Sequence, residues 1–163
     1  MNAFSFDDEY FIGLALKEAE IALEEGEVPA GCVVVRNGTV IAKAHNQVEK
    51  LCDSTAHAEI LALTQAFASC GTKLLPDCSL YVTVEPCLMC AGAILLARIK
   101  RVVYGCSEPK FGAVESLYSV MGDRRLNHNC EVTAGVLKEK CAEVMRRFFD
   151  SLRTAKRAVK KPD

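Results

Sequence analysis

Two short stretches decide the interpretation of this chain, Thr55-Ala56-His57-Ala58-Glu59 and Glu85-Pro86-Cys87-Leu88-Met89-Cys90. Each precedes an apolar run that predicts a helix, so its polar side chains fall near a helix N-terminus. The first stretch offers an imidazole and a carboxylate, and the second offers two thiols that share one helix face. Zinc accepts nitrogen and sulfur ligands of these kinds, and the positive end of a helix dipole favours the thiolate form of cysteine.

We predict that His57, Cys87 and Cys90 bind one Zn²⁺, because three protein ligands and an open position are typical of a catalytic zinc site. Glu59 leaves its helix about 200° from His57, so it is the candidate general acid/base rather than a ligand. Taken singly, the two cysteines would also suit a redox pair or burial in a core, the histidine an ordinary structural position, and the carboxylate a solvated helix start. The combination of the two stretches favours the metal site.

The composition is that of an ordinary globular protein. Half of the 163 residues are hydrophobic, and 20 basic against 21 acidic residues give a net charge of −1, which singles out no partner. This length suits a single domain over residues 1–163 with a substantial core. The odd number of cysteines, nine, excludes a complete disulfide framework, and we find neither a signal peptide nor an apolar run of membrane-spanning length. These features predict a cytoplasmic protein with reduced thiols and no membrane segment.

The first part of the chain predicts a helix followed by a hairpin. The helix covers residues 7–25, with Asp7 or Asp8 as its cap, Gly26 as its end, and its acidic residues on a solvated face. Two apolar strands over 30–35 and 39–45 flank Asn37-Gly38, a strong two-residue turn signal.

After the hairpin, predicted helices and strands alternate. The helices cover about 55–69, 87–97 and 138–160, and the strands cover 78–84, 101–104 and, as a short edge strand, 131–136. We expect Asp53, Ser54 or Thr55 to cap the first of these helices and Gly105 to end the strand over 101–104. The alternation predicts an α/β sheet with helices on both faces and its functional site at the carboxyl ends of the strands.

Three further features suit contact with a nucleic acid. Asn46 follows a strand and offers both a donor and an acceptor, and Lys110-Phe111 joins a cation to an aromatic ring in the loop over 107–117. The last helix is basic, with Asp150 as the one acid among Arg146, Arg147, Arg153, Lys156, Arg157, Lys160 and Lys161. The alternatives are a turn asparagine, an exposed lysine beside a packed phenylalanine, and a solvated helix end that suits the helix dipole.

The chain resembles the bacterial tRNA-specific adenosine deaminases of the cytidine deaminase-like superfamily. The resemblance covers nearly the whole chain and rests on Glu27-Val28-Pro29-Ala30-Gly31, His45-Asn46, 54–60, 84–94, 101–105, Gly112-Ala113, Ser116-Leu117, Leu126-Asn127-His128 and Phe148-Phe149. It implies a three-layer α/β/α sandwich with a mixed five-stranded sheet. It also implies a homodimer with one catalytic Zn²⁺ per subunit, no organic cofactor, and hydrolytic conversion of adenosine to inosine at the anticodon wobble position, chiefly of an arginine tRNA.

By the same resemblance, Asn46 contacts the flipped nucleoside, and its pocket is lined by Val28, Ala58, Val84, Glu85 and Pro86. The resemblance also implies that the loop around Lys110 holds flanking nucleotides and that Phe149 lies near the anticodon. The basic charge of the last helix adds Arg153, Lys156 and Arg157 to the expected RNA contacts. Family members often carry aspartate where this chain has Glu108 and a smaller residue where it has Phe111, so the flanking contacts stay open.

Three alternatives remain open from the sequence, and one of them is a redox protein that uses Cys87 and Cys90 as its thiol pair. A cytidine, deoxycytidylate or guanine deaminase would share every zinc-site residue, because the shape of the pocket selects the base. A zinc or RNA-binding module without catalysis would need a fourth protein ligand, for which Cys52 and Cys106 are the nearest candidates.

Overall fold

A mixed five-stranded sheet forms the middle layer of the computed structural model, which describes residues 6–159 and the side chains of residues 8–158. Its strands are β1 (Gly31–Arg36), β2 (Thr39–His45), β3 (Cys78–Val84), β4 (Arg101–Cys106) and β5 (Glu131–Ala134). They lie in the order β2-β1-β3-β4-β5. β1 pairs antiparallel with β2 and β3, whereas β3, β4 and β5 run parallel.

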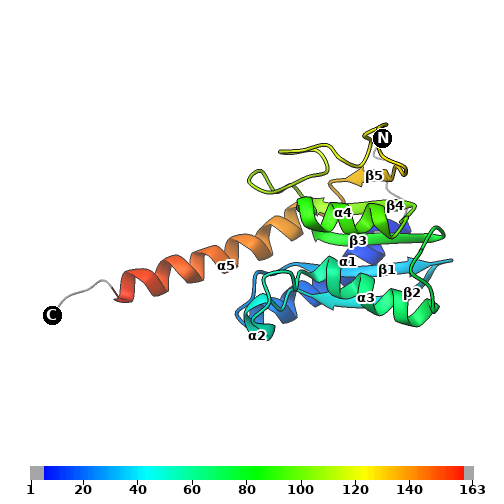
Figure 1. The fold of residues 1–163 in the computed structure, drawn as a ribbon. Coiled ribbons are helices and arrows are strands. Elements are labelled where there is room, and N and C mark those ends of the chain that lie inside the picture. Colours follow the sequence, from blue (N-terminus) through cyan, green and yellow to red (C-terminus); the bar gives the residue numbers. More distant parts are fainter. Residues whose placement is uncertain (1–5, 160–163) are drawn as a thin grey trace.

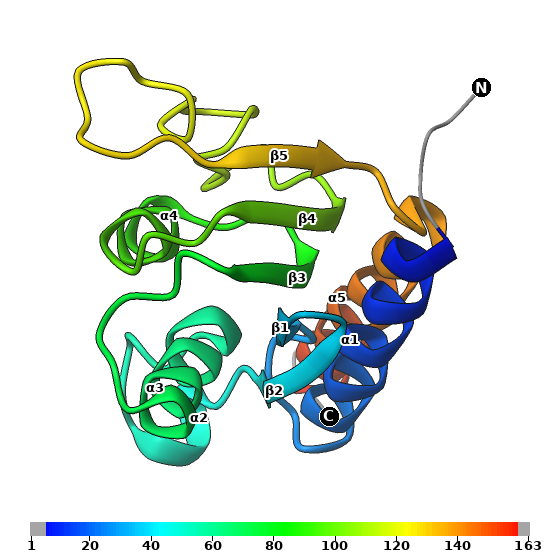
Figure 2. The same cartoon turned by 90° about the vertical axis from the view of Figure 1, so that its right-hand side faces the viewer.

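Helices cover both faces of the sheet (Figures 1 and 2). α1 (Phe6–Glu24) and α5 (Lys138–Val159) lie on one face, and α3 (Ala58–Cys70) and α4 (Leu88–Leu96) lie on the other. The three-layer α/β/α sandwich with a mixed five-stranded sheet is therefore confirmed. In the described part of the chain, no helix has the length and hydrophobicity that a membrane span requires.

Two hydrophobic clusters pack against opposite faces of the sheet. Val34 and Leu80 belong to the cluster under α3 and α4, while Val33 and Tyr81 belong to the cluster under α1 and α5. Neighbouring strand residues point to opposite faces, and both faces are covered here. This burial explains why β1 and β3 are continuous apolar runs in the sequence instead of alternating ones.

The hairpin between β1 and β2 turns at Asn37 and Gly38, with φ of 50° and 75°. Positive φ at both positions suits the two-residue turn that the Asn-Gly pair predicts. β2 spans the predicted residues, and β1 is shifted by one residue. β2 ends at His45, so His45 and the following Asn46 lie at the carboxyl end of this strand.

The start of α3 differs from the prediction. His57, not Asp53, Ser54 or Thr55, is the residue that precedes the first helical turn. The Asp53 carboxylate instead accepts hydrogen bonds from the backbone N–H and the hydroxyl of Thr55, at 2.8 and 2.7 Å, and so closes a local turn. A four-residue helix that the sequence did not predict, α2 (Val48–Leu51), precedes this turn.

The sequence predicted that Gly105 ends β4, but the strand continues to Cys106. A Cβ atom at Gly105 would lie 2.3 Å from Cys141 Sγ and 2.6 Å from the Thr83 carbonyl oxygen. The glycine is therefore required by the close approach of α5 to the sheet, not by the end of a strand.

The acidic face of α1 is only partly solvated, and the prediction of a solvated face was wrong for Glu18. Glu18 is buried and forms ion pairs with Lys43 and His45 at 3.3 and 3.2 Å. Glu20 pairs with Arg147 of α5 at 2.8 Å. These pairs join α1 to β2 and to α5.

The prediction that Asp8 caps α1 was also wrong. α1 begins at Phe6, so Asp8 lies inside the helix, and its buried carboxylate accepts two hydrogen bonds of 2.8 Å from the guanidinium of Arg101 in β4. The side chain of Asp7 lies outside the described residues.

The outer half of α5 extends beyond the sheet (Figure 1). It carries Arg153, Lys156 and Arg157, all exposed. Two further basic residues of the predicted helix, Lys160 and Lys161, lie outside the described residues.

Candidate active site

The structure brings His57, Cys87 and Cys90 together, although 30 residues separate His57 from Cys87. His57 directly precedes α3, Cys87 directly precedes α4 at the carboxyl end of β3, and Cys90 lies in the first turn of α4. His57 Nδ1 lies 3.6 Å from both sulfur atoms. Among the described side chains, these three form the one group of three or more candidate metal donors within 4.8 Å of each other.

The spacing of these donor atoms fits a zinc ion. A nitrogen ligand at about 2.0–2.1 Å and a sulfur ligand at about 2.3 Å, joined at a tetrahedral angle, lie about 3.6 Å apart. Both measured nitrogen–sulfur distances equal this value. Within residues 8–158, neither Cys52 nor Cys106 belongs to the group, so the donor set has three members and leaves a fourth position for a substrate or water.

The charges of the group also suit a metal. Hydrogen bonds with the Cys90 thiol and with His57 together lower the pKa of Cys87 to about 4, against the opposing effect of burial. The pKa of Cys90 is raised, first by its hydrogen bond with Cys87 and then by burial. The hydrogen bond with Cys87 raises the pKa of His57, so without a metal the group holds one thiolate beside a basic imidazole.

Glu59 lies beside this group without belonging to it. It occupies the first turn of α3, is 5% exposed, and forms a side-chain hydrogen bond with Cys90. Burial raises the pKa of its carboxyl group above the ordinary value. A buried carboxyl group with a raised pKa, next to the candidate metal donors, is placed to accept a proton and return it.

Glu85 precedes the second motif and organises the loop over 107–117. Its carboxylate is 3% exposed and accepts hydrogen bonds from five loop donors. The donors are the Ser116 hydroxyl and the backbone N–H groups of Glu108, Val114, Glu115 and Ser116, at 3.0, 3.1, 2.8 and 2.9 Å. Burial raises the pKa of Glu85, but these hydrogen bonds outweigh it and the net pKa is lowered.

The same loop reaches the metal site. Cys87 and Gly112 form an antiparallel bridge, and the Ala113 N–H donates to the Pro86 carbonyl oxygen at 2.9 Å. The Glu85 carboxylate points into the loop, and its expected place in the nucleoside pocket stays a prediction. The hydrogen bonds to Glu85 fix the loop residues relative to the candidate metal donors.

Val84, Lys110 and Phe149 line one cavity of about 270 Å³ between the end of β3, the loop and α5. The sequence predicted contacts with substrate or RNA for each of the three, and the fold brings them together from positions far apart in the chain. Phe111, next to Lys110, is 68% exposed and lies outside this cavity lining. Glu108 also lines the cavity, and one of its carboxylate oxygens accepts a 2.9 Å hydrogen bond from the Lys110 N–H.

The remaining residues expected in the pocket are spread over buried and open positions. Ala58 and Pro86 are both buried, and each is the sequence neighbour of a candidate metal donor. Val28, in contrast, is 40% exposed. Asn46 is 5% exposed, and its neighbour Gln47 donates a 3.0 Å backbone hydrogen bond to Ala56. That bond holds the end of β2 beside the segment that carries His57.

Sequence reasoning missed one polar residue near this site, Glu27. It is 1% exposed, and its carboxylate accepts a 3.0 Å hydrogen bond from the side-chain amide of Asn46. The available signal was an acid between Gly26 and the apolar residues that lead into β1.

This sheet topology, with one histidine and two cysteine donors and a buried carboxylate beside them, defines the class of zinc-type deaminases. A model of the MafB19-like deaminase family matches residues 6–153. The tRNA-specific adenosine deaminase of Streptococcus pyogenes serotype M1 is 47% identical over 93% of this chain and 88% of that protein. The Bacillus subtilis protein of the same name is 46% identical over 94% and 96%. The chain therefore belongs to the family of tRNA-specific adenosine deaminases, as the sequence resemblance indicated.

Solved structures agree with this placement. A structure from work on A-to-I editing by tRNA:A34 deaminases at the wobble position is 45% identical, with a TM-score of 0.80 over 83% of this chain and 98% of that one. Guanine deaminase from Nitrosomonas europaea is 26% identical, with a TM-score of 0.76 over 86% and 83%. The fold thus serves more than one base.

Proposed function

We propose that this protein is a hydrolase that converts adenosine to inosine at the anticodon wobble position of tRNA, chiefly of an arginine tRNA. The observation that carries the proposal is the zinc-compatible donor group beside a buried carboxylate, in a chain 46–47% identical to tRNA-specific adenosine deaminases. The reaction consumes one water and releases ammonia.

His57, Cys87 and Cys90 would hold the Zn²⁺ ion, one per subunit, through Nδ1 and the two Sγ atoms. Zinc in a three-ligand site supplies an activated water at neutral pH. The Glu59 carboxylate accepts a proton from the attacking water and donates a proton to N1 of the adenine. It then passes a proton to the N6 amine, which leaves as ammonia, so one group acts first as base and then as acid.

The buried position of Glu59 means that the adenine must leave its stack to be reached. The bases of an anticodon loop are unpaired, so extruding one of them costs less than opening a duplex. We place the extruded nucleoside against Asn46, with Val28, Ala58, Val84 and Pro86 around it and Glu85 supporting the loop beside it. The cavity lined by Lys110 and Phe149 is the proposed place for a flanking nucleotide, because it combines a cation with an aromatic ring.

The outer half of α5 is the proposed contact for the RNA backbone. Changing Lys156 and Arg157 together to glutamine is expected to weaken binding of a tRNA anticodon stem-loop about tenfold and to lower the salt dependence of binding by about two charges. Turnover at saturating RNA and zinc content should not change. Titrations at several salt concentrations measure both effects.

A matched control is available on the same helix. Lys138 and Lys140 are exposed at its other end, and changing both to glutamine removes the same charge. If the two double variants lose affinity equally, the outer half of α5 has no special role in RNA binding.

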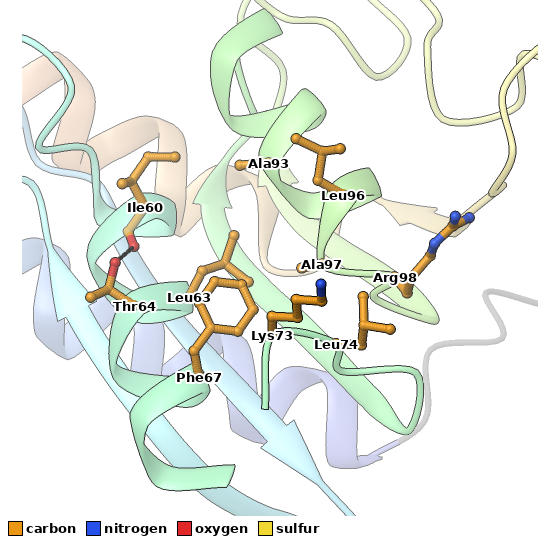
Figure 3. A pocket seen from close by; sticks show the side chains of 10 residues that line it. All are labelled: Ile60, Leu63, Thr64, Phe67, Lys73, Leu74, Ala93, Leu96, Ala97 and Arg98. Atoms are coloured by element: carbon orange, nitrogen blue, oxygen red, sulfur yellow. Dashed lines mark hydrogen bonds between the residues drawn. The ribbon is translucent and has the colours of Figure 1, made fainter. Parts of the chain in front are cut away.

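A homodimer is also part of the proposal. It is supported by an apolar groove of about 540 Å³ between α3 and α4, lined in part by Leu63, Phe67 and Leu96 (Figure 3). Leu96 is 80% exposed, and a second copy would cover such a surface. We treat residues 1–163 as one domain, because both hydrophobic clusters share a single sheet.

We assign the protein to the cytoplasm. All nine cysteines are free thiols in the structure, which suits a reducing compartment. No membrane and no organic cofactor enter the proposed reaction.

The function is tested with zinc-loaded protein and an unmodified arginine-tRNA anticodon stem-loop that carries adenosine at the wobble position. We expect inosine, read by sequencing as A-to-G at that position, and no product from the same stem-loop with cytidine there. Free guanine and free cytidine are tested in parallel. Conversion of guanine but not of the stem-loop would replace the proposal with the activity of the Nitrosomonas relative.

A further inference from the structure

Glu27 is a buried acid whose carboxylate accepts three hydrogen bonds. It accepts hydrogen bonds from Asn46 Nδ2 at 3.0 Å and from the backbone N–H groups of Glu49 and Lys50 at 3.2 and 2.8 Å. At 1% exposure it receives almost no solvation from water, so these bonds compensate for its burial. The two backbone donors belong to the first turn of α2, which fixes the position of both carboxylate oxygens.

This arrangement determines which way the Asn46 carboxamide points. A carboxylate accepts hydrogen bonds and cannot donate them, so the amide nitrogen of Asn46, not its oxygen, must face Glu27. The two ends of an asparagine amide are otherwise hard to distinguish, and here the chemistry of the partner decides between them. The side-chain oxygen of Asn46 and its second amide proton then face away from Glu27.

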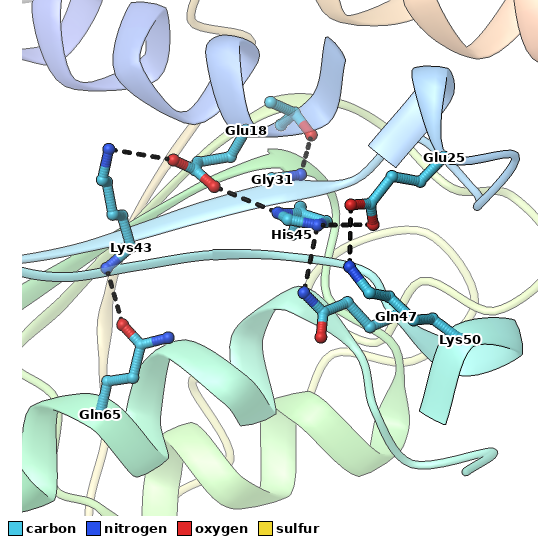
Figure 4. Close-up of polar contacts among 9 residues, drawn as sticks. Glu18, Glu25, Gly31, Lys43, His45, Gln47, Lys50 and Gln65 are labelled. Atoms are coloured by element: carbon cyan, nitrogen blue, oxygen red, sulfur yellow. Dashed lines mark hydrogen bonds and ion pairs between the residues drawn. The ribbon is translucent and has the colours of Figure 1, made fainter. Parts of the chain in front are cut away.

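The backbone at Asn46 is held independently of Glu27. Its N–H donates to the Ala30 carbonyl oxygen at 3.0 Å. On one side, His45 bridges Glu18 and Glu25 at 3.2 and 3.1 Å, as Figure 4 shows. On the other side, the Gln47 N–H donates to Ala56. A change at Glu27 therefore frees the Asn46 side chain without releasing the strand end.

We infer that Glu27 is a positioning residue for deamination, which locks the Asn46 carboxamide in the one orientation that presents its oxygen and second N–H to the base. The inference rests on the proposed function, in which Asn46 contacts the flipped nucleoside. A site whose polar groups are fixed before binding loses less freedom when the substrate arrives, and it rejects a base whose donors and acceptors do not match. Glu27 thus contributes to rate and base selection without touching the substrate.

Glu27→Gln tests this inference, because glutamine keeps the size of the side chain and adds a donor. Its amide cannot satisfy all three donors, and Asn46 can turn its oxygen toward the new N–H. We expect kcat/KM for the stem-loop to fall about 10- to 100-fold with zinc content unchanged. Glu27→Asp, which keeps an acceptor-only group, should lose less. Glu49→Gln is the matched control, since it removes a nearby exposed charge and leaves the backbone N–H in place.

A double-variant cycle separates this role from a purely structural one. If Glu27 acts through Asn46, adding Glu27→Gln to Asn46→Ala lowers kcat/KM no further than Asn46→Ala alone. Losses that multiply would show that Glu27 acts by another route and would overturn the inference. So would a Glu27→Gln enzyme with the kcat/KM of the wild type.

A measurement without turnover keeps this inference distinct from the proposed function. In ¹⁵N-labelled protein, the side-chain amide signal of Asn46 is assigned by its loss in Asn46→Ala. We expect its protons to exchange with solvent slowly in the wild type and in Glu49→Gln, and at least about tenfold faster in Glu27→Gln. Equal exchange rates overturn the inference whatever the substrate. A wild type that converts no adenosine overturns the proposed function, and the exchange rates then decide whether Glu27 holds Asn46.

Discussion

Glu59→Gln is expected to lower turnover of the tRNA stem-loop by about 10³-fold or more while zinc stays at one ion per chain. Glu59 is not among the three donor atoms that fit the metal, so its replacement leaves the ligand set intact. Glutamine fills the same buried space in the first turn of α3 but cannot accept and return a proton. The loss therefore falls on the chemical step, which single-turnover kinetics measures directly.

The expected size of this effect follows from the double use of one carboxylate. The attacking water, adenine N1 and the leaving amine each exchange a proton, and no second acid is proposed for any of these steps. Binding of the stem-loop should change little, because the proposed RNA contacts lie on α5 and the 107–117 loop. Retention of near wild-type turnover by Glu59→Gln, with zinc bound, would remove Glu59 from the mechanism.

Residue spacing predicted that the candidate metal donors come together, because much of their arrangement is set locally in the chain. Cys87 and Cys90 are three residues apart and follow a strand directly, so the chain itself fixes how they are presented. His57 comes from another segment, but the predicted parallel strands already placed its helix at the same edge of the sheet. Four strands were predictable from apolar runs and the Asn-Gly turn, whereas the segment over 131–136 was expected only as a short edge strand and the mixed five-stranded sheet was implied by the family resemblance.

The polar supports behind the site were not predictable in the same way. Glu27 and Glu85 look like ordinary acids in the sequence, yet both are buried. Their partners lie 19 to 31 residues further along the chain, so their roles exist only once the loops have folded over them. Glu18 was misread as solvated for the same reason, since β2 brings Lys43 and His45 to it.

Cys87→Ala is expected to reduce bound zinc from one ion per chain to near zero in purified protein. With two donors left, zinc affinity should fall on the order of 10²-fold or more, because each ligand contributes to a tetrahedral site. Activity should be lost with the metal. Thermal stability should also fall, since the zinc would join the start of α3 to the start of α4, and binding to the folded state alone stabilises it. Metal analysis and a thermal melt measure both changes.

Cys52→Ala provides the matched control. Cys52 is exposed and lies outside the donor group, so this variant should keep its zinc, its melting temperature and its activity. Removing zinc from the wild type with a chelator should give the same low melting temperature as Cys87→Ala, and added Zn²⁺ should restore the wild type only. If Cys87→Ala binds a full equivalent of zinc and still deaminates RNA, the metal is held elsewhere. In that case Cys87 and Cys90 return to the redox pair that their spacing alone also allows.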